Sequence, residues 1–204
     1  MMHTFSTMKH SDEMKKFFED RRSDNSTITI FEAFDKGFEA AEKSPKINPR
    51  STTIEYHKLD NERQVFFYEQ DFYVFSNFSA FTLKWRGNLF KTSEEAYHWE
   101  KFPHNKELQD AIMSSSSAHK VFNLAKKFKD ECRSDWGDIK VSVMSDILKA
   151  KLEQHEYVRQ KLIATGDREL IEDSWRDDFW GWGPNKDGKN MLGKLWMEIR
   201  RELS

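Results

Sequence analysis

Cysteine is nearly absent from this chain of 204 residues: Cys132 is the only one, so no disulfide can form within the chain. A disulfide framework is therefore excluded, and a reducing, cytoplasmic setting is expected. An excess of charge is missing too, since 33 Lys and Arg stand against 35 Asp and Glu, for a formal net charge of -2. The overall charge thus gives no sign of binding to nucleic acid or acidic membranes. A partner of that kind would need a local basic groove.

Long apolar runs are also lacking. No stretch approaches the length of a membrane-spanning helix, and the N-terminus has no basic segment followed by an apolar one, as a signal peptide has. A soluble intracellular protein with no membrane partner is expected. Aromatic residues, by contrast, are abundant, with 17 Phe and 7 Trp. Buried rings usually explain such a content, but rings also line pockets in which bases or sugars stack.

The composition divides the chain into two parts. Residues 1–64 are charged and interrupted, with SPKINPRSTT at 44–53 typical of a linker. Phe31, Phe34 and Phe38 have the spacing of a short amphipathic helix. We therefore predict an N-terminal extension and linker over 1–64, which serves packing or partner binding, and one domain over 65–204.

Within the domain, strands are predicted at 65–68 and 72–78, and a hairpin at 82–91 turns near Gly87. Helices are predicted within 91–102 and at 106–113, 118–129, 139–164 and the C-terminal end. In the last helix four leucine and isoleucine side chains are spaced for burial: Leu192, Leu195, Ile199 and Leu203. A few strands followed by many helices predict a single, predominantly helical α+β domain, without the alternation that a parallel sheet needs.

The segment KTSEEAYHWEKF at 91–102 combines aromatic and charged residues. Thr92 or Ser93 is placed to cap its helix, and Thr92 with Glu95 has the capping-box spacing. An apolar stripe of Ala96, Trp99 and Phe102 opposes a polar face, which consists of Glu94, Tyr97, His98 and Lys101. That face is either an ordinary solvated surface or a carboxylate and an amine that share one cleft. The spacing alone leaves both interpretations open.

A glycine-rich loop, WGWGPNKDGKNMLG, covers 180–193. From Gly183 it has the G-x-x-x-x-G-K spacing of a P-loop, but Asn190 stands where that motif needs Ser or Thr, and no buried strand precedes it. A nucleoside triphosphatase is therefore not indicated. A loop before a helix still offers free N–H groups to a phosphate, with Asn190 as helix cap and Lys189 as a charge, although a plain turn explains the pattern equally well.

Other chemistry is not indicated. The chain has no H-x-x-x-H pair and no cysteine beside its histidines, so no metal site is predicted. It also has no G-x-S-x-G elbow, and Cys132 lies in charged surroundings typical of a surface turn.

Several stretches, taken in order, resemble one family. They are FSNF at 75–78, TSE followed by KF within 92–102, WG at 180–181 and GKNMLGKLWMEIR at 188–200. Together they are similar to the YbiA-like family, also called the NADAR domain, from residue 65 to residue 203. The resemblance implies that family's fold and the cleavage of an N-glycosidic bond, without metal or cofactor. Its members act on riboflavin-pathway intermediates, releasing ribose 5-phosphate, or remove ADP-ribose from modified guanine in nucleic acid.

The implied reaction assigns roles to residues that match the family's motifs. Breaking a C–N bond at a sugar needs a proton for the leaving nitrogen and stabilisation of positive charge on the ribose. Glu94 is the expected acid/base, Lys101 an amine nucleophile or electrostatic clamp, and Asp177 an aid to ribose orientation or proton transfer. The expected substrate contacts are Asn77, Phe78, Tyr97, His98 and Trp180, with Gly181, Gly183, Gly188, Lys189 and Asn190 on the phosphate side. Gly193 is expected to permit close packing of the last helix.

The sequence departs from the family at three positions. Glu95 stands where His is usual, His98 where Gln is common, and Ala118 where Pro follows the serine run. Glu95 and His98 border the proposed site, so these departures affect the identity of the substrate more than the type of reaction. His98 either takes part in proton transfer or only packs against its neighbours. ADP-ribosylated guanine is the favoured substrate, because the extension is too short for the biosynthetic domain often fused to the flavin-pathway enzymes. A non-catalytic ADP-ribose or nucleotide-binding module, and an interaction protein acting through residues 1–64, are the alternatives.

Overall fold

The computed structural model describes residues 60–68 and 73–203. The chain divides into two compact units between Thr53 and Ile54, and every described residue belongs to the second unit. The predicted helix around Phe34 and the linker at 44–53 lie outside the described residues. The division into an extension over 1–64 and a domain over 65–204 therefore stays a prediction.

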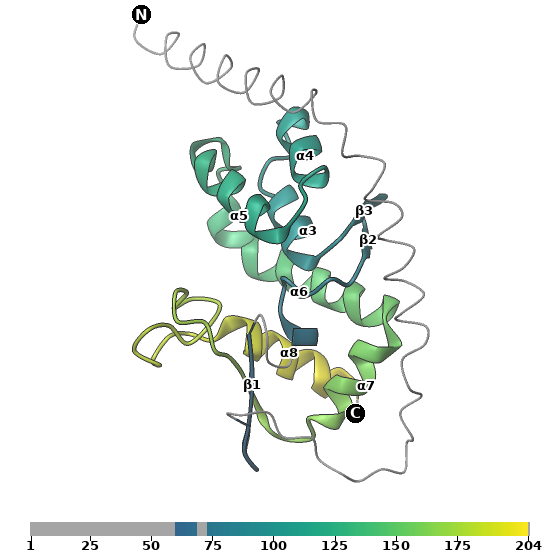
Figure 1. Cartoon of the computed structure of the whole chain (residues 1–204), viewed down its shortest axis with the longest axis vertical. Coiled ribbons are helices and arrows are strands. Elements are labelled where there is room, and N and C mark those ends of the chain that lie inside the picture. The colour runs from purple at the N-terminus through teal and green to yellow at the C-terminus, as the bar shows by residue number, and fades with distance from the viewer. Residues whose placement is uncertain (1–59, 69–72, 204) are drawn as a thin grey trace, which may run out of the picture. The chain divides into compact units, whose positions relative to one another are not determined.

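The described domain is a helix-rich α+β fold, as predicted (Figure 1). Its short strands are β1 (Gln64–Phe67), β2 (Leu83–Trp85), β3 (Asn88–Phe90) and β4 (Glu169–Glu172). Its helices are α3 (Ser93–Trp99), α4 (Lys106–Met113), α5 (Ala118–Lys127), α6 (Trp136–Gln154), α7 (Glu156–Ala164) and α8 (Met191–Glu202), with 3-10 turns η1 (Tyr73–Phe75) and η2 (Lys129–Glu131). None of these helices is both long and apolar enough to cross a membrane.

The predicted hairpin is confirmed. Strands β2 and β3 pair antiparallel, with Leu83 opposite Phe90, and the turn consists of Arg86 and Gly87. Both turn residues have positive φ, 45° and 81°, as a two-residue turn matched to the right-handed twist of its strands requires.

The strand predicted at 72–78 is wrong. Its first described residues form the turn η1, and the chain then bends through Ser76–Ser79. The backbone carbonyls of this segment find donors on helices instead of on a neighbouring strand. The indole N–H of Trp196 donates to the Phe75 carbonyl at 2.9 Å, and the Lys151 ammonium donates to the Val74 carbonyl at 2.7 Å.

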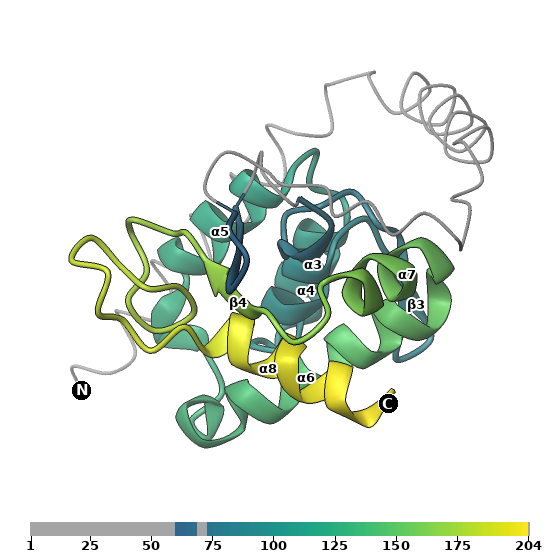
Figure 2. The ribbon, with the colours of Figure 1, turned by 90° about the horizontal axis from the view of Figure 1, so that it is seen from below.

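A strand that the sequence pattern did not predict, β4, pairs in parallel with β1 (Figure 2). Val65 lies opposite Leu170, and Phe67 lies opposite Glu172. The expectation that the domain has no parallel pairing is therefore wrong. Nearly all the helices of the domain lie between the two strands in the sequence. The sequence therefore shows no strand–helix–strand alternation from which this parallel pair could be predicted.

The helix predicted at 139–164 is two helices. It breaks at His155, which has extended backbone angles and whose Nε2 lies 2.7 Å from the carbonyl oxygen of Thr82. The helix predicted at 118–129 ends at Lys127 and is followed by η2. Ser117, the last residue of the serine run, caps this helix by accepting the Lys120 N–H at 3.3 Å.

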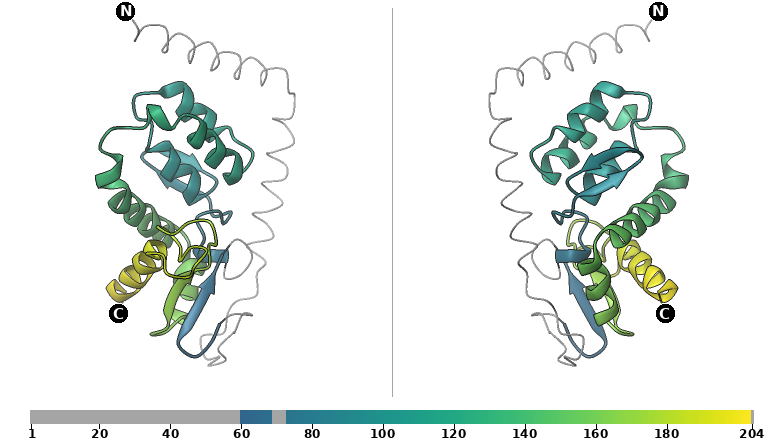
Figure 3. Two further views of the ribbon diagram at one scale, coloured as in Figure 1. Left: turned by 90° about the vertical axis from the view of Figure 1, so that its left-hand side faces the viewer. Right: turned by 90° about the vertical axis from the view of Figure 1, so that its right-hand side faces the viewer.

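Helix α3 occupies the centre of the domain, in contact with α4, α5, α6 and the hairpin (Figure 1). The β1–β4 pair lies at one end of the domain and α4 and α5 lie at the other (Figure 3). The core is built mainly of aliphatic side chains, and it includes the fully buried rings of Phe67, Phe75, Phe90, Phe102, Phe128 and Trp196. Burial in the core therefore accounts for part of the aromatic content of the sequence.

Candidate active site

The polar face of α3 is buried. Every residue from Ser93 to His98 is buried, so the interpretation of this face as a solvated surface is wrong. The helix begins as predicted, because Thr92 Oγ1 accepts the Glu95 N–H at 3.1 Å. The reciprocal half of the capping box does not form, since the Glu95 carboxylate accepts the Lys91 N–H at 2.7 Å instead. Burial raises the pKa of Glu95 to about 7, against the opposing effects of this N–H and the Lys91 charge.

Glu94 and His98 form a buried pair one turn apart. They are 7% and 4% exposed, and Glu94 Oε1 lies 2.7 Å from His98 Nε2. Burial lowers the pKa of His98, an effect that Lys101 adds to and Glu94 opposes. A neutral imidazole therefore donates from Nε2 to the Glu94 carboxylate, and its Nδ1 is buried without a protein partner. His98 orients Glu94 and is a poor proton carrier at neutral pH.

Lys101 lies just beyond the helix that was expected to contain it. The helix ends at Trp99, and the Lys101 N–H donates to the His98 carbonyl in a tighter turn. Its Nζ lies 5.0 Å from the ring centre of Tyr97 and 5.6 Å from that of Trp136. Burial lowers the pKa of Lys101, while the negative charges of Glu94 and Asp177 oppose that shift. An amine whose pKa is lowered in this way is a better nucleophile at neutral pH.

The loop that follows β4 brings Asp177 and Trp180 to the same place. Asp177 Oδ1 accepts the N–H groups of Phe179 and Trp180, both at 2.8 Å, which fixes the turn. The Trp180 ring packs edge-on against Tyr97 at 5.6 Å between ring centres. Burial, together with the charges of Glu94 and Asp177, raises the pKa of Tyr97, so its hydroxyl keeps its proton. Three segments of the chain thus converge on Tyr97.

Asn77 adds a fourth segment. Its backbone carbonyl accepts the Glu94 N–H at 3.0 Å, so the turn after η1 touches the first turn of α3. The side chain is 5% exposed, and its Oδ1 is buried with no partner in the described protein. A buried acceptor without a partner costs about 1–3 kcal/mol, which a donor on a ligand would recover. Phe78, expected beside it, packs edge-on against His119 of α5 at 5.1 Å.

The glycines of the loop have a structural reason of their own. A Cβ on Gly181 would lie 2.7 Å from Ser174 Cβ, and a Cβ on Gly188 would lie 2.7 Å from the Asp178 carbonyl. Gly183 has a φ of 71°, which L-residues rarely adopt. The loop therefore packs tightly on itself, and this packing by itself explains the glycines. Their contact with a phosphate stays a prediction.

Asn190 does not cap α8 with its side chain, contrary to expectation. Its Oδ1 accepts the Glu172 N–H at 3.0 Å, and its Nδ2 donates to the Leu170 carbonyl at 2.8 Å. Both ends of the amide thus bind β4, and the backbone adopts the left-handed region with a φ of 49°. Gly193 permits the close approach of α8 that was expected, since a Cβ there would lie 2.0 Å from the Leu170 carbonyl.

Lysine side chains gather around Phe179. Lys189, expected to contact phosphate, is exposed and has its Nζ 5.3 Å from the Phe179 ring centre. Lys140 of α6, which sequence reasoning missed, has its Nζ 3.7 Å from the same ring centre. The positive charge of Lys140 also lowers the pKa of Lys101, so these two amines are neighbours. No sequence signal separates Lys140 from an ordinary solvated lysine on an amphipathic helix.

Sequence reasoning also missed Glu172, the last residue of β4. Its Oε2 is buried and has no partner in the described protein. Burial, with the negative charges of Asp177 and Glu94, raises the pKa of this carboxyl to about 8. Three carboxyl groups therefore share this region: Glu94, Glu172 and Asp177. Since β4 was not predicted, no sequence pattern placed Glu172 in this region.

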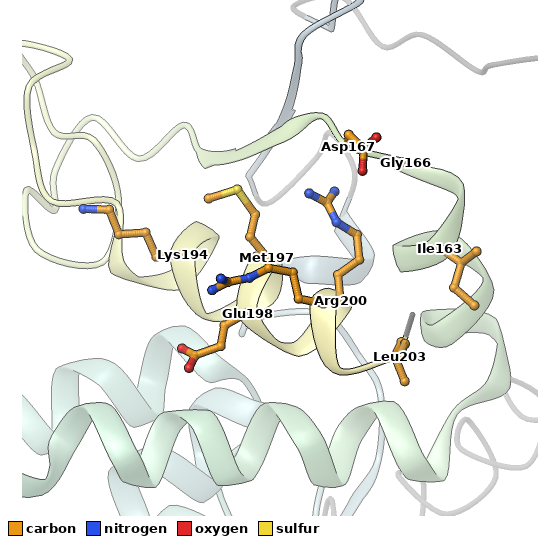
Figure 4. A pocket seen from close by; sticks show the side chains of 9 residues that line it. Ile163, Gly166, Asp167, Lys194, Met197, Glu198, Arg200 and Leu203 are labelled. Carbon is orange, nitrogen blue, oxygen red and sulfur yellow. The ribbon is translucent and has the colours of Figure 1, made fainter.

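One pocket lies elsewhere, where α8 faces α7 and the turn after it (Figure 4). Met197 and Arg200 of α8 line it, with Ile163 and Asp167 on the other side, and Lys194 lies at its edge. None of the candidate residues lines it. Within 60–68 and 73–203, no group of three or more His, Cys, Asp or Glu side chains is placed to hold a metal ion.

The fold and the site together define a class of protein: a small, helix-rich α+β domain with carboxyl groups and an amine beside buried aromatic rings. A model of the NADAR domain matches residues 66–204, and the chain belongs to the NADAR domain family. The resemblance carried by the short motifs is thereby confirmed.

Similar proteins agree with this assignment. The N-glycosidase YbiA of Escherichia coli strain K12 is 33% identical over 155 residues, which make up 76% of this chain and 96% of YbiA. The NMR structure of E. coli YbiA matches with a TM-score of 0.64 at 34% identity, over 71% of this chain and 87% of that one. A riboflavin biosynthesis protein of Vibrio vulnificus is 35% identical over 144 residues, 70% of this chain. The chain spans only 39% of the length of that Vibrio protein.

Proposed function

We propose that this protein is an N-glycosidase that hydrolyses the bond between a nitrogen base and a phosphorylated ribose. Within that class, we propose that it removes ADP-ribose from ADP-ribosylated guanine in nucleic acid. The reaction class rests on family membership and on YbiA, an N-glycosidase whose length the match covers almost completely. The observation that supports the site best is that Glu94 and Lys101, from α3 and the turn after it, lie within range of the charge of Asp177, from the loop after β4.

The proposed reaction uses these groups on the ribose. Negative charge from Glu94 and Asp177 stabilises the positive charge that develops at the anomeric carbon as the C–N bond lengthens. Lys101, an amine of lowered pKa, either captures the opened sugar as a Schiff base or holds the phosphorylated ribose by charge. The unpartnered Asn77 Oδ1 accepts a hydrogen bond from the sugar or the base.

Aromatic rings and amines favour a large, charged substrate. The rings of Tyr97, Trp180 and Phe179 form a chain of edge-on contacts, and the partly exposed rings of Trp180 and Phe179 offer surface on which a base can stack. Lys140 and Lys189 flank Phe179 and supply two positive charges suited to a pyrophosphate. ADP-ribose has a pyrophosphate and an adenine that can use these groups, whereas ribose 5-phosphate has a single phosphate.

A second candidate substrate is the aminopyrimidine ribotide of riboflavin synthesis. It is favoured by the 35% identity to the Vibrio vulnificus protein, which is named for riboflavin biosynthesis. Both candidates join a nitrogen base to the anomeric carbon of a phosphorylated ribose, so the same catalytic groups would serve either one.

The test is an assay of the full chain on each substrate. The protein is incubated with ADP-ribosylated guanosine in DNA and, separately, with the aminopyrimidine ribotide, and mass spectrometry detects free ADP-ribose or ribose 5-phosphate. We expect ADP-ribose release, and we expect Glu94→Gln and Lys101→Met to abolish turnover while the circular dichroism spectrum is unchanged. Lys106→Met, on an exposed lysine of α4, is the matched control and should retain full activity.

The outcomes separate the proposals. Release of ribose 5-phosphate alone would replace the guanine substrate by the riboflavin intermediate. Binding of ADP-ribose without any release of product would point to a non-catalytic binding module. Full activity in both site variants would remove the assignment of Glu94 and Lys101.

A further inference from the structure

We propose that Glu172 donates the proton to the leaving nitrogen, the role that the sequence pattern assigns to Glu94. This inference rests on the proposed N-glycosidase activity and names a further catalytic residue for it. Glu94 then acts as the charged carboxylate that faces the ribose.

The backbone of Glu172 is held rigidly at the entrance to the site loop. Its N–H donates to Asn190 Oδ1 at 3.0 Å, and its carbonyl accepts the Trp182 N–H at 3.2 Å. A Cβ on Gly181 would lie 2.9 Å from that same carbonyl, so the loop packs directly against the end of β4. Glu172 is therefore fixed at the base of the loop that carries Asp177 and Trp180.

One oxygen of the carboxyl group lacks a hydrogen-bond partner in the described protein. Glu172 Oε2 is buried and makes no hydrogen bond within the described protein. A buried carboxylate without donors is strongly disfavoured, whereas a protonated carboxyl in the same place has one O–H to give. This O–H is the group that a leaving nitrogen requires.

Charges from two other segments keep the proton on Glu172. Glu94 of α3 and Asp177 of the loop add their negative charges to the effect of burial, and the pKa of Glu172 rises to about 8. Lys101, Tyr97 and His98 lie around Glu94 in turn. Glu172 is therefore protonated at neutral pH. Two carboxyl groups whose surroundings separate their protonation states suit the roles of acid and charged partner in glycoside cleavage.

Glu94 is less suited to donate a proton. Its Oε1 is already engaged, at 2.7 Å, with Nε2 of His98, whose lowered pKa leaves Nε2 as a donor to a carboxylate. Glu172 therefore donates the proton, and Glu94 faces the ribose.

In the proposed step the electrons of the C–N bond leave with the nitrogen, which takes the proton from Glu172. A water oxygen forms the new bond to the anomeric carbon and gives one proton to the Glu172 carboxylate. The net change is one water consumed, one N–H and one anomeric hydroxyl formed, and Glu172 restored.

Glu172→Gln tests the proposal on whichever substrate the wild-type protein cleaves. Gln has the shape and the hydrogen-bond donor of the protonated acid but cannot transfer a proton. We expect kcat to fall by about 10²- to 10⁴-fold, the usual contribution of general acid catalysis, with KM nearly unchanged. The loss of wild-type activity at basic pH, expected as Glu172 ionises, should also be absent from the residual activity.

Glu169→Gln is the matched control, because Glu169 is an exposed carboxylate on the same strand, bonded to Gln64 at 2.9 Å. It should retain both the rate and the pH profile of the wild type. Glu172→Asp keeps a carboxyl group at this position. Its kcat should be reduced, but its activity should still fall at basic pH, as in the wild type. This variant serves as the test if the Gln variant does not fold. Wild-type kcat in Glu172→Gln, or no such loss of activity in Glu172→Asp, overturns this inference alone. Absence of wild-type activity on both substrates overturns the proposed function itself.

Discussion

Replacing Lys151 by methionine should change how the stability of the protein depends on pH. Lys151 lies on α6, is fully buried, and its Nζ donates to the Val74 carbonyl at 2.7 Å, the Ser76 carbonyl at 3.1 Å and Ser79 Oγ at 2.7 Å. Burial lowers its pKa from 10.5 to about 7. In the unfolded chain the amine keeps its ordinary pKa, so between about pH 7 and 10.5 the unfolded state binds the extra proton. The wild type therefore gains stability as pH rises through this window.

The size of the effect follows from the pKa difference. Each pH unit over which the unfolded state binds one more proton contributes about 1.4 kcal/mol. Between pH 6 and pH 9, with the pKa of Lys151 near 7, the free energy of unfolding of the wild type should rise by about 2.5 kcal/mol relative to Lys151→Met. At pH 9 the variant should also be less stable by about 2–4 kcal/mol, because the buried acceptors of the 74–79 turn have lost their donor. At pH 6 the two proteins should be much closer, since the variant no longer buries an ammonium ion.

The measurement is urea unfolding of both proteins at several pH values between 6 and 9. Other groups whose pKa values shift on folding, such as Glu95 and Glu172, are present in both proteins and cancel in the difference. Lys149→Met, an exposed lysine on the same helix that pairs with Glu202, is the control and should follow the wild type. A stability difference between wild type and Lys151→Met that is independent of pH would refute the reasoning.

Three further predictions concern the site and its packing. Asn77→Ala removes a buried acceptor without a protein partner, so thermal unfolding should show unchanged or higher stability, while KM rises about tenfold for one lost hydrogen bond; a clear loss of stability would show that Asn77 is structural. Lys140→Met should weaken ADP-ribose binding, measured by calorimetry, about tenfold and flatten its salt dependence, whereas the exposed Lys120→Met should do neither. Gly193→Ala should lower the free energy of unfolding by about 1–3 kcal/mol, because its Cβ has no room, whereas Gly137→Ala in α6 meets no atom within 4 Å and should be neutral or stabilising. Equal stability of the two alanine variants would contradict that packing argument.

Local patterns predicted most of the secondary structure. The helix at 106–113 matches α4 at both ends, and the hairpin turns at Gly87 as expected. These elements are set by capping residues, apolar spacing and positive φ, which act over a few residues. The break at His155 could not be seen in the same way, because the residue that accounts for it, Thr82, lies far away in the sequence.

The candidate site was predicted in part. The motif around Glu94 and Lys101 predicted this segment as the site, and the structure places both residues within range of the charge of Asp177. Glu172 and Lys140 were missed, since a glutamate in an unpredicted strand and a lysine on an amphipathic helix look like surface residues. Whether these roles are catalytic stays a prediction until the variants are assayed.

What the sequence determined by itself is the set of helices, the hairpin and the ordered motifs that mark a NADAR domain. Only the tertiary structure decided that the polar face of α3 is buried, that β1 and β4 pair in parallel and that Glu172 lies within range of the charges of Glu94 and Asp177. The physical reason is the separation along the chain over which each effect acts. Periodicity and capping act between neighbours along the chain, whereas burial and charge act between side chains that only folding brings together.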